Sequence, residues 1–133
     1  MRAYLTHCSA QKNHSLQDSG EKVTPDRLYT AASTQAFMSR CKERRVDWAI
    51  LSDLYGVWFS DVEHEWYEKH PDTVTDQEFS EILNDFDQKL KNYDEIWFYF
   101  NSEGFHPFYQ EILRRTELKD RVRQFTDIEE IVS

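Results

Sequence analysis

The amino-acid sequence predicts an α/β fold, a three-layer α/β/α sandwich around a mostly parallel sheet of four strands. Two short apolar runs carry this prediction. Residues Trp48–Leu51 form a run too short for an ordinary helix, and the aromatic run Ile96–Phe100 has the same character. Continuous apolar strands that alternate with helical segments are typical of a parallel sheet covered on both faces.

The first half of the chain supplies two strands and one helix to this prediction. Arg2–Thr6 is expected to form the first strand and Trp48–Leu51 the second. A helix is expected over Pro25–Arg44, because Thr24 is a suitable N-cap and proline loses nothing at the first helical position. The segment 8–26 has no sustained periodicity, and a loop of that length in a compact domain is usually either functional or a sign that its elements have been assigned wrongly.

The second half begins with the helix that the sequence predicts best. Thr75 and Glu78 form a capping box, and an apolar stripe with helical spacing follows, made of Phe79, Ile82, Leu83, Phe86 and Leu90. Residues 54–70 are aromatic and acidic and are expected to hold at most a short helix. After the strand at 96–100, a helix over Phe108–Arg115 and a strand over Val122–Phe125 complete an alternating order that implies right-handed crossovers.

Composition predicts one domain over residues 1–133 with a real core, since 133 residues include 4 Trp, 7 Tyr and 9 Phe. No apolar run is long enough to span a membrane, and the N-terminus has no apolar signal segment. With only two cysteines, we expect a cytoplasmic protein with reduced thiols. The net charge of −9 disfavours non-specific binding to polyanions.

Ligands of parallel sheets usually bind beyond the carboxyl ends of the strands. Three predicted loops meet at that edge, over residues 8–13, 52–56 and 101–106. The candidate catalytic residues in these loops are Cys8, Lys12 and Asp53. The candidate ligand-binding residues are Ser9, Ser15, Ser52, Tyr55, Gly56, Asn101 and His106.

Two of these candidates have alternative interpretations. Cys8 would act as a nucleophile if His7 or Lys12 lowered the pKa of its thiol, and it would otherwise be a small buried side chain at the end of a strand. Asp53 would form an acid–base pair with Glu103, or both would be exposed loop carboxylates.

The sequence contains no motif that indicates a metal or a cofactor. Its histidines, at positions 7, 14, 64, 70 and 106, do not show the close spacing to one another or to Cys8 that marks a zinc site. The glycine-rich motifs of dinucleotide and P-loop sites are also missing. We therefore predict no metal and no cofactor.

Two segments resemble known families. Cys8–Lys12 reads C-S-A-Q-K and, with Ser15, resembles the P-C-x3-K-P-Y-x2-S-x2-H signature of archaeosine synthase, in a domain related to the uracil-DNA-glycosylase fold. Trp48, Ile50–Ser52 and Tyr55–Gly56 are similar to the W-x-I-L-S-x-x-Y-G pattern of small YaaA-type α/β proteins. The resemblance spans roughly residues 4–70 and extends more weakly to 109. It implies a uracil-DNA-glycosylase-like fold with a nucleobase or nucleotide pocket after the first two strands.

Archaeosine synthase attaches lysine to a 7-deazaguanine base in tRNA. By resemblance we expect a domain related to nucleobases or nucleic acids, in 7-deazaguanine-type modification, with a nucleobase, nucleotide, tRNA or DNA as partner. Whether it is an enzyme stays open, as does its oligomeric state. One alternative is a non-catalytic module that binds a protein through the acidic, aromatic stretch 54–70. Another is a stress-related DNA-binding protein, which would need a contiguous basic surface.

Overall fold

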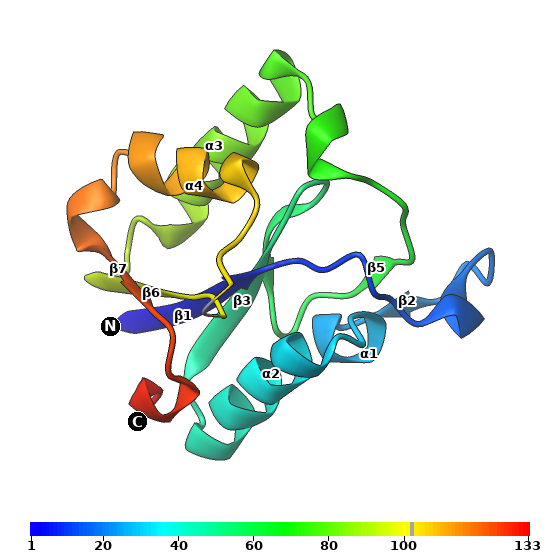
Figure 1. Ribbon diagram of the computed structural model, residues 1–133, viewed down its shortest axis with the longest axis horizontal. Coiled ribbons are helices and arrows are strands. Elements are labelled where there is room, and N and C mark those ends of the chain that lie inside the picture. The colour runs from blue at the N-terminus through cyan, green and yellow to red at the C-terminus, as the bar shows by residue number, and fades with distance from the viewer. Residues whose placement is uncertain (102) are drawn as a thin grey trace.

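The computed structural model describes residues 1–101 and 103–133. Its centre is a sheet of five strands in the order β4-β3-β1-β6-β7 (Figure 1). The strands are β1 (Arg2–His7), β3 (Asp47–Ser52), β4 (Gly56–Phe59), β6 (Glu95–Tyr99) and β7 (Val122–Phe125). All neighbouring strands are parallel except β3 and β4, which are antiparallel. The α/β class and the mostly parallel sheet are confirmed.

Helices cover both faces of the sheet. Helices α3 (Asp76–Leu90) and α4 (Pro107–Arg115) lie on one face, and α2 (Ala32–Arg44) lies on the other together with the C-terminal 3-10 turn Ile128–Glu130 (Figure 1). The three inner strands are buried almost throughout, which explains their unbroken apolar sequences. The capping box of Thr75 and Glu78 begins α3 as expected.

The sheet has five strands rather than the four predicted. The additional strand is β4, which returns beside β3 after the tight turn Asp53–Tyr55. Gly56 ends this turn at φ +71°, a conformation that glycine adopts without strain. The stretch expected to hold at most a short helix therefore begins as an edge strand.

Side chains of α3 hold strand β4 in place. The Asp85 carboxylate accepts a hydrogen bond from the Val57 backbone N–H at 2.8 Å, and the Lys89 ammonium donates to the Val57 carbonyl at 2.9 Å. Asp85 and Lys89 also form an ion pair at 2.9 Å. The backbone of Gly56 lies so close to Asp85 that a Cβ at position 56 would overlap its carboxylate.

The helix expected over 25–44 is two helices, α1 (Pro25–Leu28) and α2. Between them, Tyr29 is fully buried and extended, and its backbone pairs with Lys12 in an antiparallel bridge. This tertiary pairing overrides the local helical tendency. The bridge also ties the long loop after β1 to the body of the domain.

A small antiparallel ribbon of β2 (Lys22–Val23) and β5 (His64–Glu65) lies beyond the carboxyl ends of the parallel strands, opposite the two termini (Figure 1). Short 3-10 turns at His14–Leu16, Pro71–Thr73 and Lys119–Arg121 complete the fold. Among the described residues, no helix has the length and apolar character needed to cross a membrane.

Candidate functional site

A cavity of about 290 Å³ opens at the carboxyl ends of β1 and β3. Four segments contribute to it: the loop after β1, the turn after β3, the linker that leads to α3, and the start of α4. Its lining consists of His7, Cys8, Ser9, Ala10, Lys12, Asp53, Lys69, His70, Pro71, His106 and Tyr109. The cavity therefore lies at the edge where the predicted loops were expected to meet.

Lys12 contributes an ammonium group to this cavity. The residue is only 8% exposed, and its Nζ lies 4.6 Å from the ring centroid of Tyr67. It forms no hydrogen bond or ion pair with any described residue. The Tyr67 ring attracts the ammonium, and no carboxylate among the described residues pairs with it, so an anionic ligand in the cavity could bind it directly.

Cys8 lies at the inner end of the cavity. Its Sγ lies 2.8 Å from the Tyr109 hydroxyl and 3.7 Å from Asp53 Oδ1. Burial and the nearby negative charge of Asp53 raise the pKa of the thiol to about 11, against an opposing contribution from the Tyr109 hydrogen bond. This is the opposite of the lowered pKa that a nucleophilic role needs.

Asp53 places a buried carboxyl group beside Cys8 and is 2% exposed. Burial raises its pKa, while the positive charge of Lys12 acts in the opposite direction. Asp53 also lies at the start of the β3–β4 turn, so the hairpin positions it. The cavity thus combines the Lys12 ammonium, which has no ion pair within residues 1–101 and 103–133, and a carboxyl group that accepts a hydrogen bond from Cys8.

Three buried hydroxyl groups support the cavity from below. The hydroxyls of Tyr29 and Tyr67 lie 2.6 Å apart, and Ser52 Oγ donates to the Tyr67 hydroxyl at 3.0 Å. Ser52 Oγ also accepts hydrogen bonds from the backbone N–H groups of Leu54 and Tyr55. This network holds the Tyr67 ring in position under the Lys12 ammonium.

The structure brings together only some of the residues that the sequence singled out. Cys8, Ser9, Lys12, Asp53 and His106 line the cavity. Five other candidates lie outside its lining: Ser15, Ser52, Tyr55, Gly56 and Asn101. Ser52 and Asn101 stabilise turns, Ser15 bonds to Asn13 on the surface, and Tyr55 stacks on His64 with ring centroids 3.9 Å apart.

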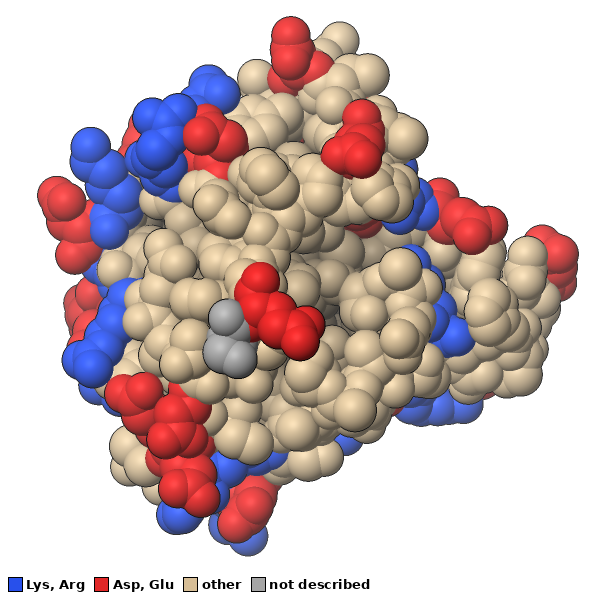
Figure 2. Space-filling model, in the orientation of Figure 1, with Lys and Arg blue, Asp and Glu red and all other residues tan. Residues whose placement is uncertain are grey.

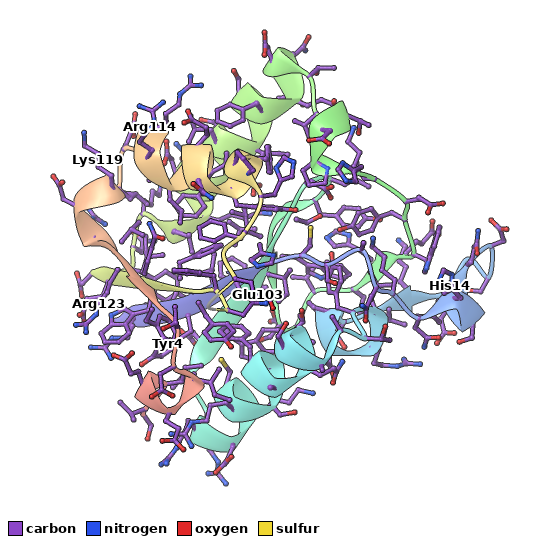
Figure 3. All side chains as sticks on the ribbon, viewed as in Figure 1. Tyr4, His14, Glu103, Arg114, Lys119 and Arg123 are labelled. Atoms are coloured by element: carbon purple, nitrogen blue, oxygen red, sulfur yellow. The ribbon has the colours of Figure 1, made fainter. Side chains whose placement is uncertain are left out.

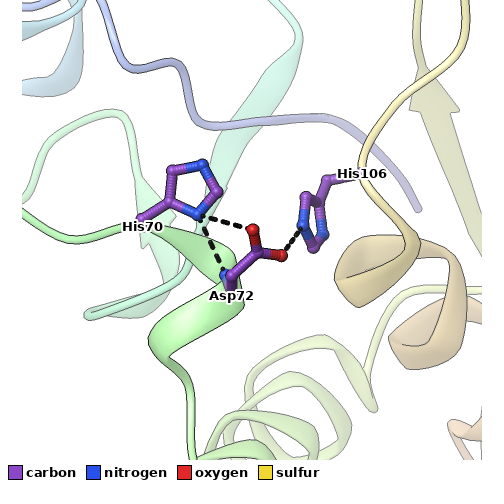
Figure 4. Close-up of side chains that lie close together, drawn as sticks. All are labelled: His70, Asp72 and His106. Atoms are coloured by element: carbon purple, nitrogen blue, oxygen red, sulfur yellow. Dashed lines mark hydrogen bonds and ion pairs between the residues drawn. The ribbon is translucent and has the colours of Figure 1, made fainter.

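Sequence reasoning missed Lys69, His70 and Tyr109 as cavity residues. It also missed a cluster in which Asp72 lies between two histidines, with His106 Nε2 2.6 Å from Asp72 Oδ1 and His70 Nδ1 3.4 Å from Asp72 Oδ2 (Figure 4). The available signals were Pro71, which starts a new turn, and Pro107, which starts α4. Neither indicates that the two segments meet.

The surface charge around the cavity differs from the acidic average of the chain. The space-filling view is hollowed to the right of centre, with basic groups along the right side of the hollow and an acidic group at its lower left (Figure 2). Lys12 and Lys69 line the cavity, and Asp53 is the only carboxylate among its described lining residues. Lys69 also pairs with Glu78 at 3.1 Å. The local environment suits an anionic ligand.

The features that the two alternative functions require are weakly developed. Trp58 is fully buried, and Phe59 and Trp66 are half-buried, so stretch 54–70 presents few aromatic anchors. Of the basic side chains near the end of α2, Arg40 bonds to the C-terminal turn and Lys42 pairs with Asp26. In Figure 3, Arg114, Lys119 and Arg123 lie on the side of the molecule opposite His14, and Arg114 and Arg123 pair with glutamates.

Comparison of the sequence and the structure with protein-family models, curated proteins and solved structures finds no match.

Proposed function

We propose that the cavity binds a small anionic ligand that carries a nucleobase, and that the protein takes part in 7-deazaguanine-type nucleic-acid chemistry. The observation that supports this proposal is Lys12, a residue that is 8% exposed and lines the cavity, whose ammonium group has no ion pair among the described residues. A ligand phosphate or carbonyl oxygen would satisfy it. A cation in a cleft that has no protein partner attracts ligands of opposite charge.

The remaining lining residues complement a purine-like base. The Asp53 carboxyl group can accept hydrogen bonds from ring and exocyclic N–H groups, as carboxylates do at the edges of bases. His7 and Tyr109 contribute ring surfaces, and their centroids lie 5.5 Å apart. The volume of about 290 Å³ lies just below the range of about 300–1,000 Å³ for small-molecule sites, which favours a small ligand such as a base or mononucleotide.

Cys8 is assigned a binding role in this proposal. A thiol whose pKa is about 11 is neutral near pH 7, so it can donate a weak hydrogen bond and fill space but is a poor nucleophile. Recognition of the ligand is therefore the function that these groups support best. Lys12 and Asp53 carry most of the expected affinity.

The test is a calorimetric titration with guanine, 7-deazaguanine, GMP and inorganic phosphate. We expect the nucleotide to bind more tightly than phosphate or the bases alone. Lys12→Met should weaken nucleotide binding at least 10-fold, while the exposed Lys22→Met serves as the matched control and should bind normally. Asp53→Asn should weaken binding of the bases more than binding of phosphate, because only a base offers N–H donors to the carboxylate.

Two results would contradict the proposal. One is the absence of binding to any of the four compounds at millimolar concentration. The other is equal affinity in the Lys12→Met and Lys22→Met variants, which would show that the ligand binds elsewhere.

A further inference from the structure

We propose that His70, Asp72 and His106 bind one divalent transition-metal ion at the rim of the cavity. His106 Nε2 lies 2.6 Å from one Asp72 oxygen and His70 Nδ1 lies 3.4 Å from the other. The three ligand atoms lie within 4.8 Å of one another, and Figure 4 shows the carboxylate between the two rings. An ion placed among these three atoms could be coordinated by all three side chains at once.

The donor set indicates the kind of ion. Two imidazole nitrogens and one carboxylate oxygen suit zinc and its neighbours cobalt and nickel, whereas calcium and magnesium prefer oxygen donors alone. Three protein ligands also leave coordination positions open, which is typical of catalytic rather than structural zinc sites. The proposed site is therefore one at which water or a ligand could complete the coordination.

The cluster is built from two segments that are distant in the sequence. His70 and Asp72 flank Pro71 at the start of a 3-10 turn, and His106 is the N-cap of α4. Asp72 has no lysine or arginine partner among the described residues; both of its contacts to charged or titratable side chains are to these histidines. A carboxylate shared by two imidazoles can accept a cation without breaking an ion pair to a basic residue.

Small rearrangements would complete the site. Ligand atoms bound to one zinc ion at about 2.0–2.2 Å lie roughly 3 Å or more apart, so the close contact between Asp72 and His106 must open slightly. His70 and Asp72 have exposed side chains, and the turn that carries them contains no buried residue, so this movement is available.

Two hydrogen bonds from backbone N–H groups to the histidine rings would be lost when the ion binds. At present His70 Nδ1 accepts from the Asp72 N–H at 3.1 Å, and His106 Nδ1 accepts from the Phe108 N–H at 3.0 Å. Coordination through His70 Nδ1 displaces the first bond. Coordination through His106 Nε2 requires the ring proton to move from Nε2 to Nδ1, which removes the second bond, so the amide of Phe108 should report ion binding.

His70 and His106 also line the cavity, which places the ion beside the proposed ligand site. Ion binding itself requires only the three side chains. It can therefore be measured in the absence of any nucleotide, and its outcome does not depend on the proposed function.

The experiment is a titration of the untagged full chain with Zn²⁺ in competition with a chromophoric chelator, and with Co²⁺ followed by absorption. We expect one ion per chain. His70→Ala, Asp72→Asn and His106→Gln should each weaken binding at least 10-fold. The controls are His14→Ala, which removes an exposed histidine far from the cluster, and Asp18→Asn, which changes an exposed aspartate at a left-handed position that asparagine also tolerates.

Nitrogen chemical shifts provide a second readout. Zinc should shift Nδ1 of His70 and Nε2 of His106, and should move the amide resonance of Phe108. The proposal is overturned if the wild-type chain binds less than one ion per chain, or if the three variants bind as tightly as the controls. It is also overturned if Co²⁺ produces a thiolate charge-transfer band that Cys8→Ser abolishes, because the ion would then lie at Cys8.

Discussion

The thiol of Cys8 lies 2.8 Å from the hydroxyl of Tyr109, a contact that joins the end of β1 to helix α4 beneath the cavity. Asp53 lies on the other side of the same sulfur atom, 3.7 Å away. The two neighbours affect the thiol in opposite directions, because a hydroxyl can donate to the thiolate whereas a carboxylate repels it. This opposition makes the electrostatics of the site testable.

Substitution of either neighbour should change the pKa of Cys8, which is about 11, in a direction that depends on the neighbour. Asp53→Asn removes a like charge and should lower the pKa. Tyr109→Phe removes a hydrogen bond to the thiolate and should raise it. The carbon-13 shift of the Cys8 Cβ against pH measures both changes in a Cys41→Ser background. Shifts in the same direction for both variants would contradict this arrangement.

The buried thiol of Cys8 should make the fold less stable in alkaline solution. Because its pKa is higher in the folded chain than the ordinary value of 9.0, its contribution is present below about pH 9 and is lost as pH rises toward 11. The two-unit difference corresponds to about 2–3 kcal/mol. Urea unfolding under reducing conditions at pH 8 to 11 should show a shallower decline for Cys8→Ala than for the wild type. Parallel curves would show that Cys8 titrates normally.

Gly56→Ala should destabilise the fold by about 2–4 kcal/mol for two reasons. Alanine is strained in the left-handed conformation of Gly56, and its Cβ would overlap the Asp85 carboxylate. Gly20→Ala is the matched control: Gly20 has φ +72° but no atom within 4 Å of a Cβ, so the cost should be about 1 kcal/mol. In an Asp85→Ala background, the cost of Gly56→Ala should fall toward the control value. An unchanged cost there would rule out the overlap as its main source.

Elements whose cause is local could be predicted from the sequence. The capping box at Thr75 begins α3, and the apolar runs at 48–51 and 96–100 form inner strands β3 and β6. The strand Val122–Phe125 has the predicted bounds. In each case neighbouring residues supply both the periodicity and the end signals.

Elements determined by distant contacts could not be predicted in this way. Tyr29 lies within a helical pattern, yet it is extended because it pairs with Lys12 and because its hydroxyl bonds to Tyr67. Strand β4 depends on the hairpin turn before Gly56 and on its anchors in α3. A periodicity argument detects neither, because the partners of Tyr29 and the α3 anchors of β4 lie more than ten positions away and the turn before Gly56 lacks a standard hairpin motif.

The residues of the candidate site likewise fall into those that local sequence could predict and those that depend on distant contacts. Cys8, Lys12 and Asp53 could be placed in one cavity because each follows a strand of a parallel sheet, and such ends share one edge. The cluster of His70, Asp72 and His106 escaped detection, since spacing rules compare near neighbours and His106 is 34 positions from Asp72. Tyr109 was missed because nothing in the sequence of α4 shows which of its faces meets Cys8.

The contacts of Asp85 and Lys89 with Val57 also affect how the molecule behaves at high concentration. An edge strand normally offers free N–H and C=O groups to any passing chain, which is a common route to aggregation. Here the outward N–H and C=O groups of Val57 already bond to these two side chains of α3. Strand β4 is thus closed at Val57 to the addition of a further strand, and this ion pair disfavours intermolecular sheet formation at this edge of the sheet.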